Sequence, residues 1–251
     1  MSNEIISKIV GIVGAPNVIE VPSEMSKNLK GNGKPVAVVL PGSTTEVSEI
    51  VKLANKEKVK IAVAGSVVNS TGLDGGIALV LSRMNKVLEI DHENLVVTVQ
   101  PGLSHKEFLS VVEEAGLYFP PEPVNVQTSS IGGCFAVGDA DSKSFQYGPT
   151  RTYLLGFEMV LPTGEVLDIG NKCIKNVSGY DFIHFAVGSQ GTLGIFTKLL
   201  VKLLPQPQAK KAVVASFPDI HKAIAAFQTI IGRNIYPTRL NVIVARASGI
   251  S

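Results

Sequence analysis

Apolar residues change from helical to strand-like spacing within the first quarter of the chain. Between residues 5 and 13 they recur at helical spacing, which predicts a short amphipathic helix. Continuous apolar runs at 36–40 and 61–64 predict two buried strands, and the capping box at 43–46 predicts that a helix begins between them. A strand, a helix and a strand with short connections predict a βαβ unit, with a parallel pair of strands and a right-handed crossover.

The middle of the chain carries shorter apolar runs separated by polar turns. Runs at 77–81, 87–90 and 95–99 predict an antiparallel meander, and a second capping box at 104–107 predicts another helix. We expect a second lobe to begin at this helix. Its further predicted elements are a hairpin formed by 154–161 and 165–169, a short helix at 181–187 and a long strand at 194–204.

Beyond Pro205 and Pro207 the pattern again alternates between strand and helix. The apolar runs at 211–217 and 240–245 predict strands, and the helical spacing of apolar residues over 219–231 predicts a helix between them. This order predicts the first βαβ unit of a further α/β domain.

Composition restricts the possible classes of function. The 251 residues are 45% hydrophobic and 18% charged, which suffices for one large or two modest domains. A formal net charge of +2 with dispersed Lys and Arg gives no sign of a nucleic-acid partner. No apolar window reaches the roughly 18 residues of a membrane span, so we expect no transmembrane segment.

Cysteine usage adds a prediction about location. The two cysteines, Cys134 and Cys173, are too few for a disulfide framework, and no Cys/His cluster offers a metal site. We therefore expect no metal and a cytoplasmic location, with peripheral attachment to a membrane through a partner left open.

Three glycine-bearing or proline-bearing turns lie between the strand-like runs of residues 120–204. They are the turns at 120–123, 129–133 and 188–195. Glycine allows a backbone to approach a ligand closely because it has no Cβ. The pattern therefore predicts that these turns approach a flat, phosphorylated ligand.

The motifs in this region resemble a known family. Six motifs occur in the family's order, namely 120–123, 130–133, 147–151, 156–164, 175–181 and 188–195. Together they resemble the FAD-binding domain of the vanillyl-alcohol oxidase type, in its glycolate oxidase and D-lactate dehydrogenase branch. The resemblance covers roughly residues 5–205, and six ordered motifs are more specific than one glycine pattern.

The resemblance implies an α+β fold in which two subdomains hold FAD between them. It implies an FAD-binding domain at 1–205, with subdomains at about 1–100 and 101–205. Residues 206–251 would then be the start of an incomplete cap domain, formed by the first βαβ of an α/β unit.

The loop after the second predicted strand departs from the family pattern. In relatives this loop usually reads Arg-Gly-x-Gly-Thr-Gly and wraps the FAD pyrophosphate with backbone amides. Here only Gly65 keeps its place, and the candidate phosphate donors are Ser66, Asn69, Ser70 and Thr71. The alternative is an ordinary polar loop between strands.

The resemblance implies further contacts to non-covalently bound FAD. Ser129 and Ser130 either donate to phosphate or cap a turn, and Pro120 with Pro121 stiffens a turn in which a cis peptide is one option. Cys134 is interpreted as a buried, unreactive residue rather than a covalent flavin attachment. The full set of candidates here is Pro120, Pro121, Ser129, Ser130, Gly132, Gly133, Cys134, Gly138, Tyr147, Gly191, Gly194 and Ile195.

Two carboxylates follow the second glycine turn, where relatives usually have neutral residues. Asp139 or Asp141 close to a pyrophosphate would repel it by about 4 kcal/mol per close pair at an effective dielectric of about 20. Either these side chains point to solvent or the cofactor lies differently.

The implied chemistry is the oxidation of a 2-hydroxy acid of the glycolate or D-lactate type by hydride transfer to flavin. The substrate-binding Arg and the metal-binding His cluster that relatives carry in and after the cap have no counterpart here, and we assign no catalytic residue. We expect His184 to be a packed residue in an apolar stretch.

Three hypotheses follow for the whole protein. The chain is the FAD-binding subunit of an oxidoreductase, with a second flavoprotein or iron–sulfur subunit as partner. Alternatively it is a non-catalytic interaction subunit that has lost or weakened flavin binding, or a truncated product that self-associates through the incomplete cap.

Overall fold

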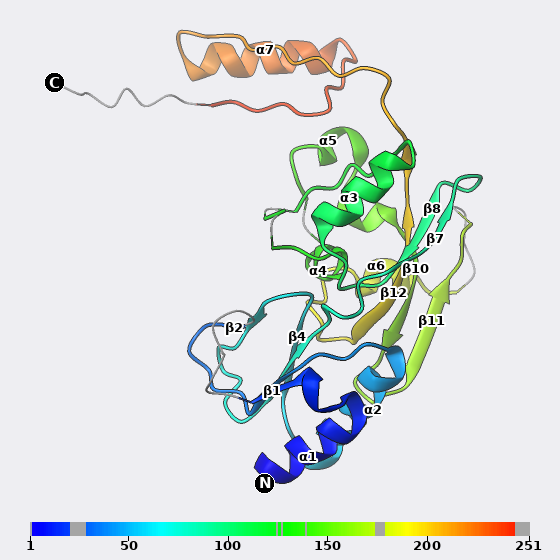
Figure 1. Ribbon diagram of the computed structural model, residues 1–251. Helices are drawn as coiled ribbons and strands as arrows, with labels where there is room; N and C mark the ends of the chain where they lie inside the picture. Colours follow the sequence, from blue (N-terminus) through cyan, green and yellow to red (C-terminus); the bar gives the residue numbers. More distant parts are fainter. Residues whose placement is uncertain are drawn as a thin grey trace, which may run out of the picture.

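Two separate β-sheets organise the chain up to residue 205 (Figure 1). The computed structural model describes residues 2–20, 29–123, 125–126, 128–138, 140–173 and 179–243. We call the sheet formed before residue 82, with its helices, the first lobe, and the sheet formed by residues 86–205, with its helices, the second lobe.

The first lobe is a four-stranded sheet covered by two helices, α1 (Ser2–Val13) and α2 (Thr44–Glu57). Its strands lie in the order β1-β3-β6-β4. Their bounds are β1 Val18–Glu20, β3 Ala37–Val39, β4 Ile61–Ala64 and β6 Ile77–Val80. The predicted N-cap is confirmed, because the Ser43 hydroxyl accepts from the Glu46 N–H at 3.2 Å. The Glu46 carboxylate accepts from the N–H of Gly42, one residue before the N-cap, at 2.8 Å.

Two sequence predictions for this region need correction. Strands β3 and β4 run parallel but are not paired, since β6 lies between them and pairs with both. Strand β6 therefore does not belong to the predicted meander. All four residues of β6 are buried, as suits a central parallel strand covered on both faces.

The second lobe is a five-stranded antiparallel sheet in the order β11-β10-β12-β8-β7. The predicted hairpin of 154–161 with 165–169 is confirmed, and so is the antiparallel pairing of the predicted strands at 87–90 and 95–99. The strand bounds are β7 Val87–Asp91, β8 Val96–Val99, β10 Leu154–Val160, β11 Val166–Gly170 and β12 Ile195–Lys202. Because β12 pairs with both β10 and β8, strands from before and after the helix predicted to start at 104–107 share one sheet.

Four helices accompany this sheet, of which α3 and α6 were predicted. Their bounds are α3 His105–Glu114, α4 Ile131–Val137, α5 Ser144–Tyr147 and α6 Phe182–Ala186. The smaller elements are η1 Ala15–Asn17, η2 Thr150–Tyr153, the parallel pair β2 Leu29–Lys30 with β5 Val68–Asn69, and the antiparallel pair β9 Leu117–Tyr118 with β13 Leu204–Pro205.

Helix α2 holds the two lobes together. The Ser48 hydroxyl donates to the Gly164 carbonyl at 2.5 Å, and the Asn55 amide donates to the Pro162 carbonyl at 2.5 Å. Val160 and Ile195, from the sheet of the second lobe, are buried in the apolar core of the first. The ends of β10 and β12 are thus fixed against the first lobe.

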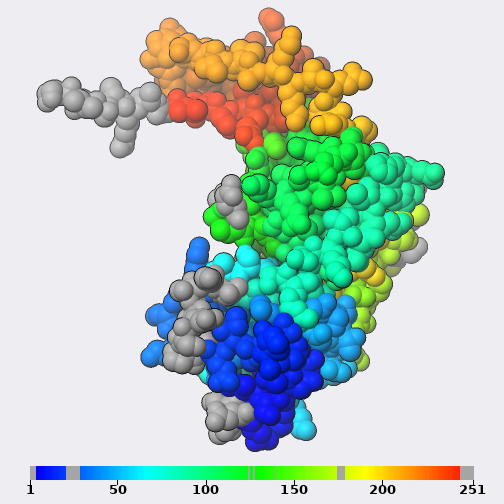
Figure 2. All heavy atoms as spheres, in the orientation of Figure 1, coloured from blue at the N-terminus to red at the C-terminus, as the bar shows by residue number. Residues whose placement is uncertain are grey.

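The segment 206–243, which we call the arm, lies on the end of the second lobe that faces away from the first lobe (Figure 2). Its helix α7 (Ile220–Gly232) is confirmed. The predicted strand at 211–217 is wrong, since no strand forms there and Val214 is 95% exposed. Residues 240–243 of the last predicted strand are not in a strand either, and residues 244–245 lie outside the described residues.

An apolar run forms a strand only when it finds a sheet to pair with, and a two-stranded ribbon alone is marginal in water. This explains why the flanking strands are missing although the helix is present. Among the helices that the structure describes, none combines the length and apolarity needed to cross a membrane.

Candidate functional site

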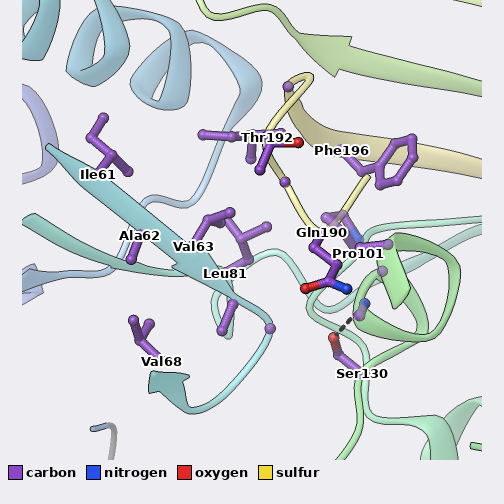
Figure 3. Close-up of a pocket in the computed structure, with 18 of the residues that line it drawn as sticks. Ile61, Ala62, Val63, Val68, Leu81, Pro101, Ser130, Gln190, Thr192 and Phe196 are labelled. Atoms are coloured by element: carbon purple, nitrogen blue, oxygen red, sulfur yellow. Dashed lines mark hydrogen bonds between the residues drawn. The ribbon is translucent and has the colours of Figure 1, made fainter. Parts of the chain in front are cut away.

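A cleft of about 860 Å³ lies where the two lobes meet. One wall is strand β4, whose outer edge has no partner strand among the described residues, together with the loop that follows it. The other wall comes from α4 and the loop at 188–194 (Figure 3). The cleft therefore lies at the carboxyl end of a parallel strand, where α/β sheets commonly bind ligands.

The two walls touch at Gly65. A Cβ at this position would lie only 1.8 Å from Oγ and 2.3 Å from Cβ of Ser130, the N-cap residue of α4. Next to this contact the Ser66 hydroxyl donates to the Thr128 carbonyl at 2.9 Å. A glycine is required here because its bare backbone lets the first lobe reach the start of α4.

The loop at 188–194 bridges both walls. The Gly188 and Gln190 N–H groups donate to carbonyls in α4 at 3.2 and 2.9 Å. On the opposite side, a Cβ at Gly191, whose φ is +79°, would lie 2.6 Å from Cγ1 of Val63 in β4. Gln190 also has a positive φ of 52° and projects its carboxamide into the cleft (Figure 3).

The lining is uncharged. Within the described part of the chain, no Lys, Arg, His, Asp or Glu lines the cleft. Part of the lining is polar, with Ser66, Asn69, Ser129 and Ser130, whereas the part near α2 is formed by apolar residues such as Val51, Ala54, Val59 and Leu161. Such a cleft suits an elongated ligand with both polar and apolar sections.

The first predicted phosphate loop is largely engaged within the protein. The Ser70 hydroxyl donates to the Lys30 carbonyl at 3.0 Å, and Ser70 is fully buried, so it does not line the cleft. The Asn69 side chain accepts from the Thr71 N–H at 3.1 Å. Among the described residues, the backbone N–H groups of Gly65 and Val67 donate to no acceptor in the chain, and both residues line the cleft.

The second predicted segment forms the start of α4. The Ser130 hydroxyl accepts from the Gly133 N–H at 3.1 Å, which caps the helix and leaves the hydroxyl proton able to donate elsewhere. The Ile131 and Gly132 N–H groups donate to carbonyls of Leu103 and Pro101, both at 2.9 Å. The N–H groups of Ile131, Gly132 and Gly133 therefore donate within the protein and are not free to bind a ligand.

Most of the predicted site residues are brought together by the fold. The cleft is lined by Gly65, Ser66, Asn69, Ser129, Ser130, Gly132, Gly133, Cys134, Gly191, Gly194 and Ile195. Cys134 is buried, with 3% of its surface exposed.

Five predicted residues lie outside the cleft lining. Besides Ser70, these are Pro120 and Pro121, which are buried, Gly138, which ends α4, and Tyr147, whose ring packs on Tyr118. The considered cis peptide is absent, since the described peptide bonds are all trans.

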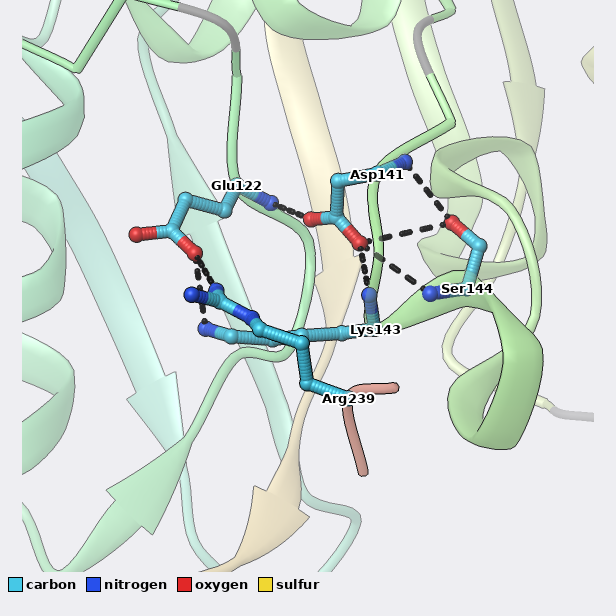
Figure 4. A network of polar contacts seen from close by, with 5 residues as sticks. All are labelled: Glu122, Asp141, Lys143, Ser144 and Arg239. Carbon is cyan, nitrogen blue, oxygen red and sulfur yellow. Dashed lines mark hydrogen bonds and ion pairs between the residues drawn. The ribbon is translucent and has the colours of Figure 1, made fainter. Parts of the chain in front are cut away.

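The carboxylate of Asp141 is turned away from the cleft. It accepts from the Lys143 and Ser144 N–H groups at 2.7 and 3.0 Å and from the Glu122 N–H (Figure 4). Asp141 is half-buried in this network and does not line the cleft, so it points neither to solvent nor at a ligand there. Asp139 lies outside the described residues.

The sequence patterns missed several lining residues. Val63, Leu161, Thr192 and Phe196 line the cleft although they look like ordinary strand or turn residues. The sheet order places β4 at an edge, and all four of its residues are half-buried, which the apolar run in the sequence does not reveal.

Comparisons with known proteins decide the family. The model of a family described as "FAD binding domain" matches residues 35–170, more than half of the chain. The chain belongs to this FAD-binding family.

Curated relatives of this FAD-binding chain include oxidoreductases. It is 40% identical over 210 residues to glycolate oxidase subunit GlcD of Bacillus subtilis, which covers 82% of this chain and 45% of the relative. It is 34% identical over 217 residues to a D-lactate dehydrogenase of Archaeoglobus fulgidus, which covers 84% of this chain and 48% of the relative. The chain thus spans about half the length of the curated relatives it matches.

Solved structures show the same fold. An alkyldihydroxyacetonephosphate synthase superposes with a TM-score of 0.80 at 24% identity, over 94% of this chain and 47% of that one. A p-cresol methylhydroxylase superposes with a TM-score of 0.71 at 21% identity, over 92% of this chain and 49% of that one. The fold is therefore that of the vanillyl-alcohol oxidase type, as the resemblance implied.

The residues of the FAD-binding domain fit this cofactor. The cleft volume lies in the range of about 300–1,000 Å³ that is usual for cofactor and ligand sites. Its backbone donors at Gly65 and Val67 suit phosphate oxygens, and its apolar part suits an aromatic ring.

The histidines of the FAD-binding domain stand apart from the cleft. His184 is exposed rather than packed, and its Nδ1 lies 2.6 Å from the Asp181 carboxylate. His105 is fully buried, and neither ring nitrogen makes a well-formed hydrogen bond. The described residues contain no cluster of metal-ligating side chains.

Proposed function

We propose that this chain is the FAD-binding part of an oxidoreductase that oxidises a 2-hydroxy acid of the glycolate or D-lactate type. The named activities of its relatives, glycolate oxidase and D-lactate dehydrogenase, support this substrate class. The observation that carries the proposal is the uncharged cleft between two lobes, which gathers the glycine and serine turns shared with the FAD-binding family.

When bound, FAD would supply the acceptor for the hydride that leaves the carbon bearing the substrate hydroxyl. In this proposal the chain itself binds and orients. Gly65 and Val67 donate backbone N–H groups, Ser130 donates its hydroxyl, and the apolar part of the cleft excludes water. FAD is held without a covalent bond, with Cys134 as a packed wall residue.

No histidine lines the described cleft, so we assign no base for the substrate hydroxyl proton to it. We propose that this base and a cation for the substrate carboxylate come from further polypeptide, either more sequence or a second flavoprotein or iron–sulfur subunit. In this proposal residues 206–251 begin the cap over the substrate. The complex would be cytoplasmic or held at a membrane by its partner.

One observation favours a second candidate function, a subunit that keeps the fold but binds FAD weakly. The hydroxyls of Ser66 and Ser70 both donate to backbone carbonyls of the protein, so the predicted phosphate loop offers few side-chain donors. Such a subunit would serve to assemble a partner that carries the chemistry.

Loading and turnover separate the two candidates. The purified chain is incubated with FAD, desalted and assayed with glycolate and D-lactate plus a dye acceptor, alone and with proteins that co-purify with it. The proposal expects a retained flavin spectrum and dye reduction once the partner is present. A chain that stays colourless after incubation and shows no thermal shift with FAD refutes the proposal and leaves the assembly role.

A further inference from the structure

Glu122 connects the wall of the cleft to the arm. It directly precedes Pro123, which lines the cleft, whereas Glu122 itself is not a lining residue and its side chain contacts Arg239 of the arm. Its Oε2 lies 3.3 Å from Nζ of Lys143 and also contacts the Arg239 guanidinium of the arm (Figure 4). One carboxylate oxygen therefore joins two cations from separate segments.

The arm reaches Glu122 along α5. The Tyr236 ring packs on the Phe145 ring with 6.0 Å between centroids, and the Thr238 hydroxyl donates to the Gln146 side chain at 2.6 Å. The next residue, Arg239, forms the ion pair with Glu122. Residues 236–239 thus form a continuous docking segment.

Asp141 fixes the receiving surface. Its carboxylate accepts from the N–H groups of Lys143 and Ser144 at the start of α5 and from the Glu122 N–H. Because the same carboxylate holds α5 and the Glu122 backbone, a shift of either element displaces the other.

Proline makes the connection to the cleft stiff. Pro121 and Pro123 flank Glu122, and each ring locks its own φ near −65°. A residue that precedes proline is itself restricted to extended conformations. A displacement of Glu122 therefore moves Pro123 instead of being absorbed by the backbone between them.

We propose that Glu122 is a positioning residue that couples docking of segment 236–239 to the shape of the cofactor cleft. Arg239 seated on Glu122 holds the Pro123 wall in place, and release of Arg239 lets this wall move. The inference rests on the proposed binding of FAD in the cleft, and it adds a link between the arm and that site.

The electrostatics of the network agree with a reversible contact. Burial raises the pKa of Glu122, but Lys143 and Arg239 outweigh it and leave the pKa below its ordinary value. The Glu122 and Arg239 side chains remain 37% and 45% exposed, so solvent screens the pair and either partner can be displaced.

The test compares four variants for FAD affinity and arm docking. R239Q and E122Q remove one partner each, and R239K keeps the charge. R233Q removes an exposed arginine of the arm whose side chain forms no hydrogen bond or ion pair among the described residues. FAD affinity is measured by flavin fluorescence, and arm docking by thermolysin cleavage near the exposed Val213 and Val214.

We expect R239Q and E122Q to speed cleavage of the arm and to raise the Kd for FAD about three- to tenfold. R239K should retain most of the affinity, and R233Q should match the wild type in both measurements. Faster cleavage with an unchanged Kd overturns the coupling and leaves a merely structural ion pair. Unchanged cleavage overturns the docking itself. A wild type that binds no FAD refutes the proposed function, and the coupling with it.

Discussion

The contact between Gly65 and Ser130 gives a prediction that the structure quantifies. In Gly65→Ala the new Cβ would lie 1.8 Å from Oγ and 2.3 Å from Cβ of Ser130, whereas ordinary contacts of a Cβ are 3.4–4 Å. The loop must therefore retreat from α4, and overpacking of this kind costs about 1–3 kcal/mol. Because the two walls then separate, we expect the Kd for FAD to rise about tenfold.

The clash involves the side chain of Ser130 alone, so a second substitution at Ser130 can relieve it. Ser130→Gly removes both clashing atoms and leaves the Ser130 Cα at 3.7 Å, an ordinary contact. Its own cost through the lost N-cap is only a few tenths of a kcal/mol. Ser130→Ala removes Oγ but keeps the Cβ, so it should not relieve the clash.

The assay is a double-mutant cycle in urea denaturation, with FAD titrations alongside. G65A/S130G should recover at least about 1 kcal/mol of the stability that G65A loses, whereas G65A/S130A should recover little. Strictly additive effects in both cycles would refute the close approach of the two lobes at this point.

Three further predictions concern the buried histidine, the charge of the cleft and the cysteine. Burial lowers the pKa of His105 to about 4 from an ordinary 6.5. Between these two pH values the unfolded chain binds a proton at His105 and the folded chain does not, so the free energy of unfolding should fall by about 3 kcal/mol as pH drops from 7 to 4. His105→Leu should flatten this part of the urea-denaturation profile, and a profile that His105→Leu leaves unchanged would contradict the assignment. Because no charged side chain lines the described cleft, the Kd for FAD measured by fluorescence should change less than about threefold between 50 and 500 mM NaCl, whereas a steep salt dependence would indicate an ion pair to the phosphates. Acid precipitation should release all flavin into the supernatant for both the wild type and Cys134→Ser, and flavin retained only by the wild-type pellet would show a covalent bond.

Local patterns predicted the elements with strong periodicity or caps. Helices α2 and α3 begin at capping boxes that are read directly from Ser43 and Ser104, and the turn between β10 and β11 is also local. Sheet order is not local. The apolar run of β6 looks the same whether it pairs with β7 or inserts between β3 and β4, and only the packing of both faces decides.

For the candidate site too, some residues were predictable from local motifs and others depended on the fold. The glycine and serine turns were found through their resemblance to a known family, and the fold brings most of them to one cleft. The hydrogen bond from the Ser70 hydroxyl to the Lys30 carbonyl depends on the pairing of β2 with β5. These two strands come from segments far apart in the sequence, so no local pattern predicts this bond. The strand predicted at 211–217 is absent from the arm. The apolar run there suits a strand, but it pairs with no strand among the described residues.

A structure of the chain determined with FAD would locate the cofactor. We expect a single FAD between the two lobes, with its phosphates at Gly65, Val67 and Ser130 and no contact to a charged side chain of the described residues. FAD bound elsewhere on the chain, or a cleft that stays empty at saturating FAD, would contradict this expectation.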